Sequence, residues 1–206
     1  MLPSGPFPQP LRCVLAARAT RLRRLPDSPR KVSMKGHCIL SHGLHSSPHA
    51  TKVSALAQVA ERLGWSHERP DYCDIDTRAG ADIRDVARRL ARLLESARAA
   101  PRPLVLVGSS MGAYISALAS LEIQPVGLFL MAPPVALPGY PRPLDAAAVP
   151  TVVVHGWHDE LIPAADVFDW CQPRSASLRL VDDGHRLERH VDVITEDFAR
   201  FLGSLA

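Results

Sequence analysis

Short apolar runs alternate with longer segments of helical periodicity through most of the chain. Three of these runs, at 104–107, 126–131 and 151–155, carry no acid, lysine or arginine. Such runs are typical of strands buried on both faces of a parallel sheet. Shorter or weaker runs predict further strands at 38–41, 66–72 and 178–181.

The segments between these runs repeat apolar residues every three or four positions, which predicts amphipathic helices. The clearest helix is 82–99, and its arginines are expected on a solvated face. In the helix predicted at 48–63, Ser47 is the expected N-cap and Pro48 the expected first helical residue. Further helices are predicted over 111–121, after Pro163 to about Trp170, and around Val191, Ile194, Phe198, Phe201 and Leu202.

This alternation predicts an α/β protein with a three-layer architecture, an open, mostly parallel sheet with helices on both faces. The crossovers should be right-handed. In such sheets the ligand site lies beyond the carboxyl ends of the strands. Residues that carry chemistry are therefore expected in the loops that follow the strands.

Charge divides the chain into an arm, residues 1–33, and a domain, residues 34–206. The arm is rich in proline and arginine and has a net charge of +6, whereas the domain carries 17 basic and 20 acidic residues. The arm could be a disordered basic tail that touches nucleic acid or anionic lipid. It could also be a targeting segment, or sequence upstream of a true start at Met34. We favour the last, because the first predicted strand begins just after Met34, and we expect removal of the arm to leave fold and activity intact.

The remaining bulk features favour a cytoplasmic protein. Cys13, Cys38, Cys73 and Cys171 show no C-x-x-C spacing and no disulfide framework, which is typical of reduced thiols. No apolar run reaches the roughly 18 residues that a membrane span needs. A slightly acidic domain is a poor nucleic-acid binder. We therefore expect no membrane or nucleic-acid partner, and the sequence leaves the oligomeric state open.

The main candidate for chemistry is the pentapeptide Gly108-Ser109-Ser110-Met111-Gly112, a G-x-S-x-G that joins a buried strand to a helix. A nucleophile elbow needs this sharp turn, with small residues on either side of a strained serine. The backbone N–H of Met111, at the start of the helix, is placed to stabilise an oxyanion. The alternative is a tight glycine-rich turn without chemistry.

A serine nucleophile needs a general base and an acid to orient that base. His185 follows the last predicted strand, at the same expected edge of the sheet as Ser110. Asp159 follows the strand at 151–155, so the chain order is serine, acid, histidine. Glu160 is the nearest rival to Asp159, and Asp182 and Asp183 are poorer candidates because they neighbour the base in sequence.

The loop after the first strand is the expected source of a second oxyanion donor, the N–H of Leu44. The histidines at 42, 45 and 49 also suggest a metal site, but no Cys or acid lies at ligand spacing within that segment. We therefore predict no metal and no organic cofactor. The residues predicted to bind substrate are His42, Gly43, Met131, Trp157 and Leu161.

Four motifs together resemble the α/β-hydrolase superfamily, and most closely its small lidless serine esterases. They are the elbow at 108–112, His42-Gly43-x-x-Ser46-Ser47-Pro48, His155-Gly156-x-x-Asp159 and Gly184-His185. The resemblance covers about residues 36–204 and implies a carboxylic ester or thioester substrate and an acyl-enzyme mechanism. Two features depart from the family. Its two opening strands have no room here unless the arm supplies one, and only 19 residues separate the strands at 126–131 and 151–155, too few for a cap domain.

The predicted function is therefore hydrolysis of a small-molecule carboxylic ester through an acyl-enzyme on Ser110. A thioesterase or a small peptidase would use the same three residues. A non-catalytic scaffold of this fold is the alternative from a different class, and a complete serine, acid and histidine set argues against it.

Overall fold

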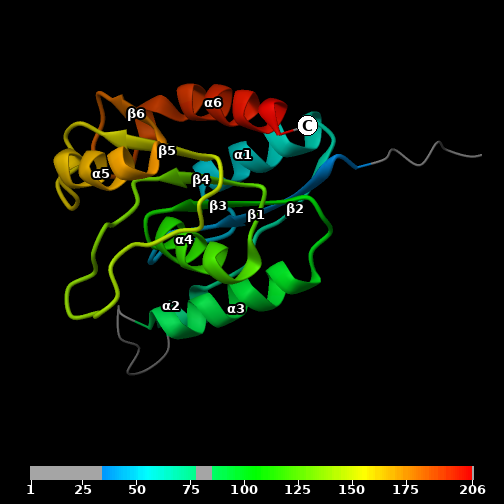
Figure 1. The fold of residues 1–206 in the computed structure, drawn as a ribbon, viewed down its shortest axis with the longest axis horizontal. Coiled ribbons are helices and arrows are strands. Elements are labelled where there is room, and N and C mark those ends of the chain that lie inside the picture. Colours follow the sequence, from blue (N-terminus) through cyan, green and yellow to red (C-terminus); the bar gives the residue numbers. More distant parts are fainter. Residues whose placement is uncertain (1–33, 78–84, 206) are drawn as a thin grey trace, which may run out of the picture. The chain divides into compact units, whose positions relative to one another are not determined.

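A computed structural model describes residues 34–77 and 85–205. The predicted arm, residues 1–33, and the first turn of the helix predicted at 82–99 lie outside the described residues. The described strands form one parallel sheet in the order β2-β1-β3-β4-β5-β6 (Figure 1). Their bounds are β1 Gly36–Ser41, β2 Trp65–Glu68, β3 Leu104–Ser109, β4 Gly127–Met131, β5 Thr151–Gly156 and β6 Ser177–Val181.

Helices cover both faces of this sheet, as the sequence predicts (Figure 1). Helices α1 (Thr51–Arg62) and α6 (Val191–Ser204) pack on one face, against alternate strand residues such as Val105 and Phe129. Helices α3 (Val86–Ala99), α4 (Met111–Ile123) and α5 (Ala164–Cys171) pack on the other. The strands are therefore buried on both faces, which explains their uninterrupted apolar runs. None of the helices within the described ranges has the length and apolar character to span a membrane.

The strand order reverses direction between β1 and β3. From β1 the chain moves outward to β2, then crosses back so that β3 lies on the other side of β1. Loops that leave β1 and β3 at their carboxyl ends therefore diverge and leave a crevice, where ligands of open α/β sheets bind. This crevice receives Ser110 and the loop that begins at His42.

Two predicted elements differ from the structure near the second strand and the first helix. The strand predicted at 66–72 ends at Glu68, because Pro70 cannot donate to a strand ladder, and the chain then forms helix α2 (Cys73–Thr77). Helix α1 begins at Thr51 rather than at Pro48. Ser47 is therefore not its N-cap but closes a turn, in which its carbonyl accepts from the Ala50 N–H at 3.1 Å.

The expectation of a fully solvated arginine face on the third helix is wrong for Arg89. Its side chain is only 1% exposed and forms an ion pair with Asp76, which is itself 3% exposed. The guanidinium also lies over the ring of Tyr72, 5.4 Å from its centroid. The cause is the segment that follows β2: helix α2, which the sequence does not predict, supplies Asp76, and Tyr72, directly before this helix, supplies the ring.

Candidate active site

Ser110 sits on the strained turn that the pentapeptide predicts. Its backbone has φ +53° and ψ −119°, a region that non-glycine residues rarely occupy. The Ser110 N–H donates to the carbonyl of Met131 at 2.8 Å, which holds the turn against β4. A Cβ on Gly108 would lie 2.2 Å from the Gly112 carbonyl oxygen, and one on Gly112 would lie 2.1 Å from that of Ser41. Only glycine lets β3, α4 and β1 come this close.

The structure brings the three candidate catalytic side chains into one hydrogen-bonded chain. His185 Nε2 lies 2.9 Å from Ser110 Oγ, and His185 Nδ1 lies 2.8 Å from Asp159 Oδ2. The residues follow β3, β5 and β6, whose carboxyl ends share one edge of the parallel sheet. Side chains separated by up to 75 positions in sequence therefore meet within hydrogen-bond distance.

The ionisation of Asp159 determines which ring nitrogen of His185 carries the proton. The Asp159 side chain is fully buried, and burial alone would raise its pKa. The hydrogen bonds from His185 and from the backbone N–H groups of Ile162 and Leu161 outweigh burial and hold the pKa of Asp159 below its usual range. An ionised carboxylate can only accept, so the proton lies on His185 Nδ1. The Nε2 lone pair is then free to accept from the hydroxyl of Ser110.

The rival acids have other partners. Glu160 Oε2 accepts the backbone N–H of His185 at 3.2 Å and so holds the main chain of the histidine rather than its ring. Asp182 pairs with His158 at 2.9 Å on the surface. Asp183 accepts from His190 Nδ1 at 3.1 Å. Geometry therefore selects Asp159 among the four acids.

A second buried histidine, which the sequence analysis assigned no role, borders Asp159. His155 is the next-to-last residue of β5, and its Nε2 lies 3.0 Å from the Ile162 carbonyl and 3.4 Å from Asp159 Oδ2. We call residues 157–163, between β5 and α5, the acid loop, because they carry Asp159. The contact with the Ile162 carbonyl connects the start of this loop to its end. Burial lowers the pKa of His155 and keeps the ring neutral. The only sequence signal was its place in the motif His155-Gly156-x-x-Asp159.

The loop after β1 lies directly against the nucleophile. A Cβ on Gly43 would be 3.4 Å from Ser110 Cβ, so Leu44 follows a residue in contact with Ser110. The fully buried His42 holds this loop: its Nδ1 lies 2.8 Å from the Gly43 carbonyl, and its Nε2 accepts the Tyr72 N–H at 3.0 Å. Met111 is the first residue of α4, where the backbone N–H has no partner within the helix.

The residues predicted to bind substrate divide into two groups. Trp157 and Leu161 are 59% and 68% exposed in the acid loop, where a ligand can reach them, and Gly43 is partly exposed beside Ser110. His42 and Met131 are 0% and 1% exposed. Met131 packs among α1 and α6, so its contribution to the site is the carbonyl that holds Ser110. Direct side-chain contact with substrate is therefore not supported for His42 or Met131.

The histidines at 42, 45 and 49 do not gather into a metal site in the described residues. Instead, His42, Asp71 and Cys73 place one ligand atom each within 4.8 Å of one another. This set fits a metal poorly, because His42 Nε2 is occupied by the Tyr72 N–H. In addition, the hydrogen bond with Asp71 raises the pKa of the Cys73 thiol, which disfavours the thiolate that a metal needs. Asp71 and Cys73 come from the segment after β2, whereas His42 comes from the loop after β1. The spacing of histidines within that one loop therefore could not indicate that these three residues lie close together.

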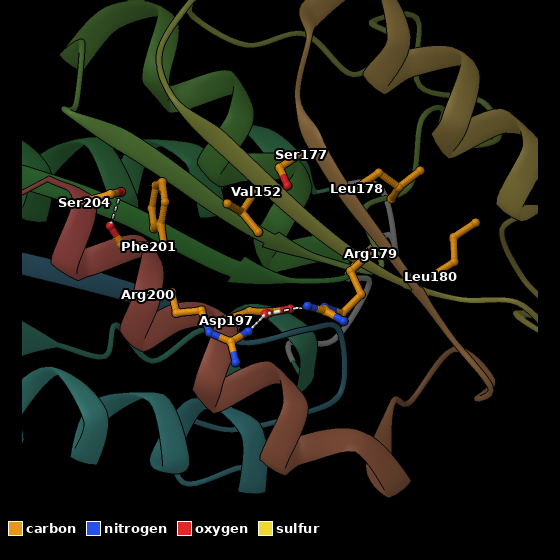
Figure 2. Close-up of a pocket in the computed structure, with 9 residues that line it drawn as sticks. All are labelled: Val152, Ser177, Leu178, Arg179, Leu180, Asp197, Arg200, Phe201 and Ser204. Atoms are coloured by element: carbon orange, nitrogen blue, oxygen red, sulfur yellow. Dashed lines mark hydrogen bonds and ion pairs between the residues drawn. The ribbon is translucent and has the colours of Figure 1, made fainter.

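A groove among the described residues lies away from these side chains. This groove of about 660 Å³ runs between the edge strand β6 and helix α6. Figure 2 shows Asp197 between Arg179 and Arg200, with Phe201 and Val152 at the apolar end. None of the three candidate catalytic residues lines it. The groove is therefore a different surface from the crevice at the carboxyl ends of the strands.

We expect the buried side chains of His42 and His155 to make the free energy of unfolding fall in mild acid. Burial lowers the pKa of His42 and of His155 below the ordinary 6.5, so the unfolded chain binds protons that the folded protein refuses. The free energy of unfolding should change little between pH 7 and 8 and fall below pH 6.5, by up to about 1.4 kcal/mol per pH unit for each histidine. Urea unfolding between pH 8 and 5 measures this slope. His155→Asn should reduce this slope. An unchanged slope would contradict the conclusion that burial lowers the pKa of His155.

Comparison with known proteins places this fold among solved hydrolases. No protein-family model and no curated protein matches the chain. A solved structure from Xanthomonas campestris pv. campestris, assigned to the α/β-hydrolase superfamily, is 58% identical, covers 82% of this chain and 99% of its own, and superposes with a TM-score of 0.80.

Two more distant structures share the fold. A serine hydrolase without a lid from Xanthomonas campestris is 22% identical over 84% of this chain and 83% of its own, with a TM-score of 0.64. Est1E from Butyrivibrio proteoclasticus is 17% identical over 84% and 88%, with a TM-score of 0.66.

Proposed function

This chain belongs to the α/β-hydrolase superfamily, and we propose that it is a serine hydrolase that cleaves a small-molecule carboxylic ester through an acyl-enzyme on Ser110. The observation that carries the proposal is the continuous chain of hydrogen bonds from Asp159 through His185 to Ser110. A buried ionised acid, an oriented imidazole and a strained serine are the parts that activate a hydroxyl nucleophile.

Acylation begins when Ser110 Oγ attacks the acyl carbonyl carbon. His185 Nε2 takes the hydroxyl proton as the C–O bond forms, and Asp159 stabilises the resulting imidazolium. The backbone N–H groups of Met111 and Leu44 stabilise the negative charge on the carbonyl oxygen, each typically worth about 3 kcal/mol. The tetrahedral intermediate then expels the alcohol, which receives its proton from His185.

Deacylation repeats these steps with water. His185 removes a proton from water as its oxygen attacks the Ser110 ester, and the tetrahedral intermediate collapses to release the acid. The proton returns to Ser110 Oγ. Every proton transfer uses groups of this chain, so we expect activity to be unchanged by metal chelators.

Three features support a small ester as substrate. Only 19 residues join β4 to β5, so no cap domain is inserted between these two strands. The exposed Trp157 and Leu161, on either side of Asp159, offer apolar surface to an acyl or alcohol group. Est1E, which shares the fold, has been solved with ferulic acid bound, and a carboxylic acid is the class of product that ester hydrolysis releases.

The proposal is tested by labelling with a fluorophosphonate, which reacts only with an activated serine. We expect stoichiometric labelling of the wild type and none of Ser110→Ala. Ser109→Ala is the matched control, because it removes the neighbouring hydroxyl on the same turn. Equal labelling of wild type and Ser110→Ala would end the assignment.

A panel of 4-nitrophenyl esters, acyl-CoA thioesters and peptide anilides then defines the substrate class. We expect the esters to give the highest kcat/KM. A preference for acyl-CoA or for anilides would instead identify a thioesterase or a peptidase with the same three residues. Absence of both labelling and turnover would favour a non-catalytic scaffold.

A further inference from the structure

The buried ion pair between Asp76 and Arg89 has no part in the mechanism proposed above. Both side chains are nearly inaccessible, at 3% and 1% exposed. Replacing a buried ion pair by apolar residues of similar volume is often neutral or stabilising, so the pair is a weak source of stability. Its position suggests a different use, because Asp76 reaches the loop beside the nucleophile.

The second oxygen of Asp76 supplies this link. Asp76 Oδ2 accepts the backbone N–H of His45 at 2.9 Å. His45 directly follows Leu44, the proposed oxyanion donor. We infer that Asp76 is a positioning residue, which fixes the peptide groups around Leu44 so that the Leu44 N–H faces the oxyanion; this inference rests on the proposed function.

The loop needs such a constraint because its backbone is unfavourable on its own. His45 has φ +52°, in the left-handed region that favours glycine. A non-glycine residue held there is strained and persists only where its surroundings enforce the conformation. The segment around α2 holds the loop at a further point, where the Tyr72 N–H donates to His42 Nε2.

Arg89 makes the contact between Asp76 and the His45 N–H rigid. Helix α2 has only five residues, too few to be a firm support alone, whereas α3 has 14 and packs in the core. The ion pair ties Asp76 to α3, and the position of Arg89 over Tyr72 ties the same guanidinium to the residue that holds His42. The loop after β1 is thereby connected to the core helix α3 through the side chain of Arg89.

Displacement of the Leu44 N–H should reduce the stabilisation of the transition state more than it reduces the binding of the substrate. The oxyanion exists only after attack, so the loss should appear in kcat and leave KM nearly unchanged. Complete removal of an oxyanion donor costs about 100-fold or more, and a loosened donor should cost about 10-fold. Affinity for a trifluoromethyl ketone, which forms a hemiketal oxyanion on the serine, should fall by the same factor.

The test uses the full chain and the double variant Asp76→Ala/Arg89→Met. Removing both charges leaves neither one buried and unpaired, so this variant should fold. We expect kcat for 4-nitrophenyl acetate to fall about 10-fold, KM to change less than about twofold, and the inhibition constant of the ketone to rise about 10-fold. Asp76→Asn/Arg89→Met also leaves no buried charge unpaired, and its amide oxygen can still accept the His45 N–H, so it should lose less and serves as the second variant.

Asp74→Ala is the matched control. Asp74 lies on the same short helix and pairs with Arg92 on α3, but this pair is exposed and does not contact the loop. Its kcat and ketone affinity should equal those of the wild type. A kcat within about twofold of wild type in the folded double variant, or a loss confined to KM, would overturn the inference.

The proposed function fails separately. If hydrolysis persists in Ser110→Ala, the oxyanion at this site has no role and the inference falls with it. If hydrolysis depends on Ser110 while the double variant keeps its kcat, only the role of Asp76 is wrong.

Discussion

Ester hydrolysis by the Ser110→Ala variant is expected to fall by about a million-fold in kcat, to the level set by the remaining groups of the site. The alanine removes the hydroxyl that His185 Nε2 contacts at 2.9 Å, so no acyl-enzyme can form on this residue. The fold should be unaffected, because the turn is held by the Ser110 backbone N–H on the Met131 carbonyl and by the two flanking glycines. Burst and steady-state kinetics with a 4-nitrophenyl ester measure the loss.

A second measurement separates a cooperating pair from two independent contributors. If Ser110 and His185 act together, the double variant Ser110→Ala/His185→Ala should be no slower than either single variant, because each removes the same step. Independent roles would make the losses multiply. Ser109→Ala, one residue earlier on the same turn, should keep at least half of the wild-type kcat and controls for disturbance of the elbow.

The sequence predicts the fold well because burial on both faces leaves a clear pattern. The central strands β3, β4 and β5 are mostly apolar and carry no acid, lysine or arginine, and their ends in the structure differ from the predicted ends by only one or two residues. Prediction is poorest between β2 and α3, where the pattern is weak. There Pro70 ends the strand and a five-residue helix follows, too short to show a period.

The three candidate catalytic residues were predictable because parallel strands share a carboxyl edge. A loop after any strand delivers its side chains to that edge, so chain order and strand position alone bring Ser110, Asp159 and His185 together.

The groups around these residues were not predictable. Asp76 reaches the loop after β1 from α2, and Arg89 reads as one more arginine on a polar helix face. Met131 reads as a pocket residue at a strand end, yet its side chain faces the core. Strand ends can be read from periodicity, but pairings between distant loops depend on tertiary contacts.

Asp159→Asn should lower kcat by about 10⁴-fold while leaving the geometry of the site intact. The structure indicates why the amide cannot substitute. Asp159 Oδ1 accepts two backbone N–H groups, those of Leu161 and Ile162, each at 2.9 Å. In the variant, the amide oxygen must stay at this position, since an NH₂ group there would face two donors.

The amide NH₂ is therefore forced toward His185 Nδ1, and it can only donate to that nitrogen. Nδ1 then becomes the acceptor, the ring proton moves to Nε2, and the imidazole presents a proton instead of a lone pair to Ser110. Steady-state kinetics on a 4-nitrophenyl ester measure the loss, and thermal unfolding checks the fold. Asp182→Asn, which alters the exposed pair with His158 on the neighbouring loop, is the matched control and should retain wild-type kcat. A kcat in Asp159→Asn above about a tenth of the wild-type value would mean that Asp159 does not set the tautomer of the base, since a wrong tautomer costs far more than tenfold.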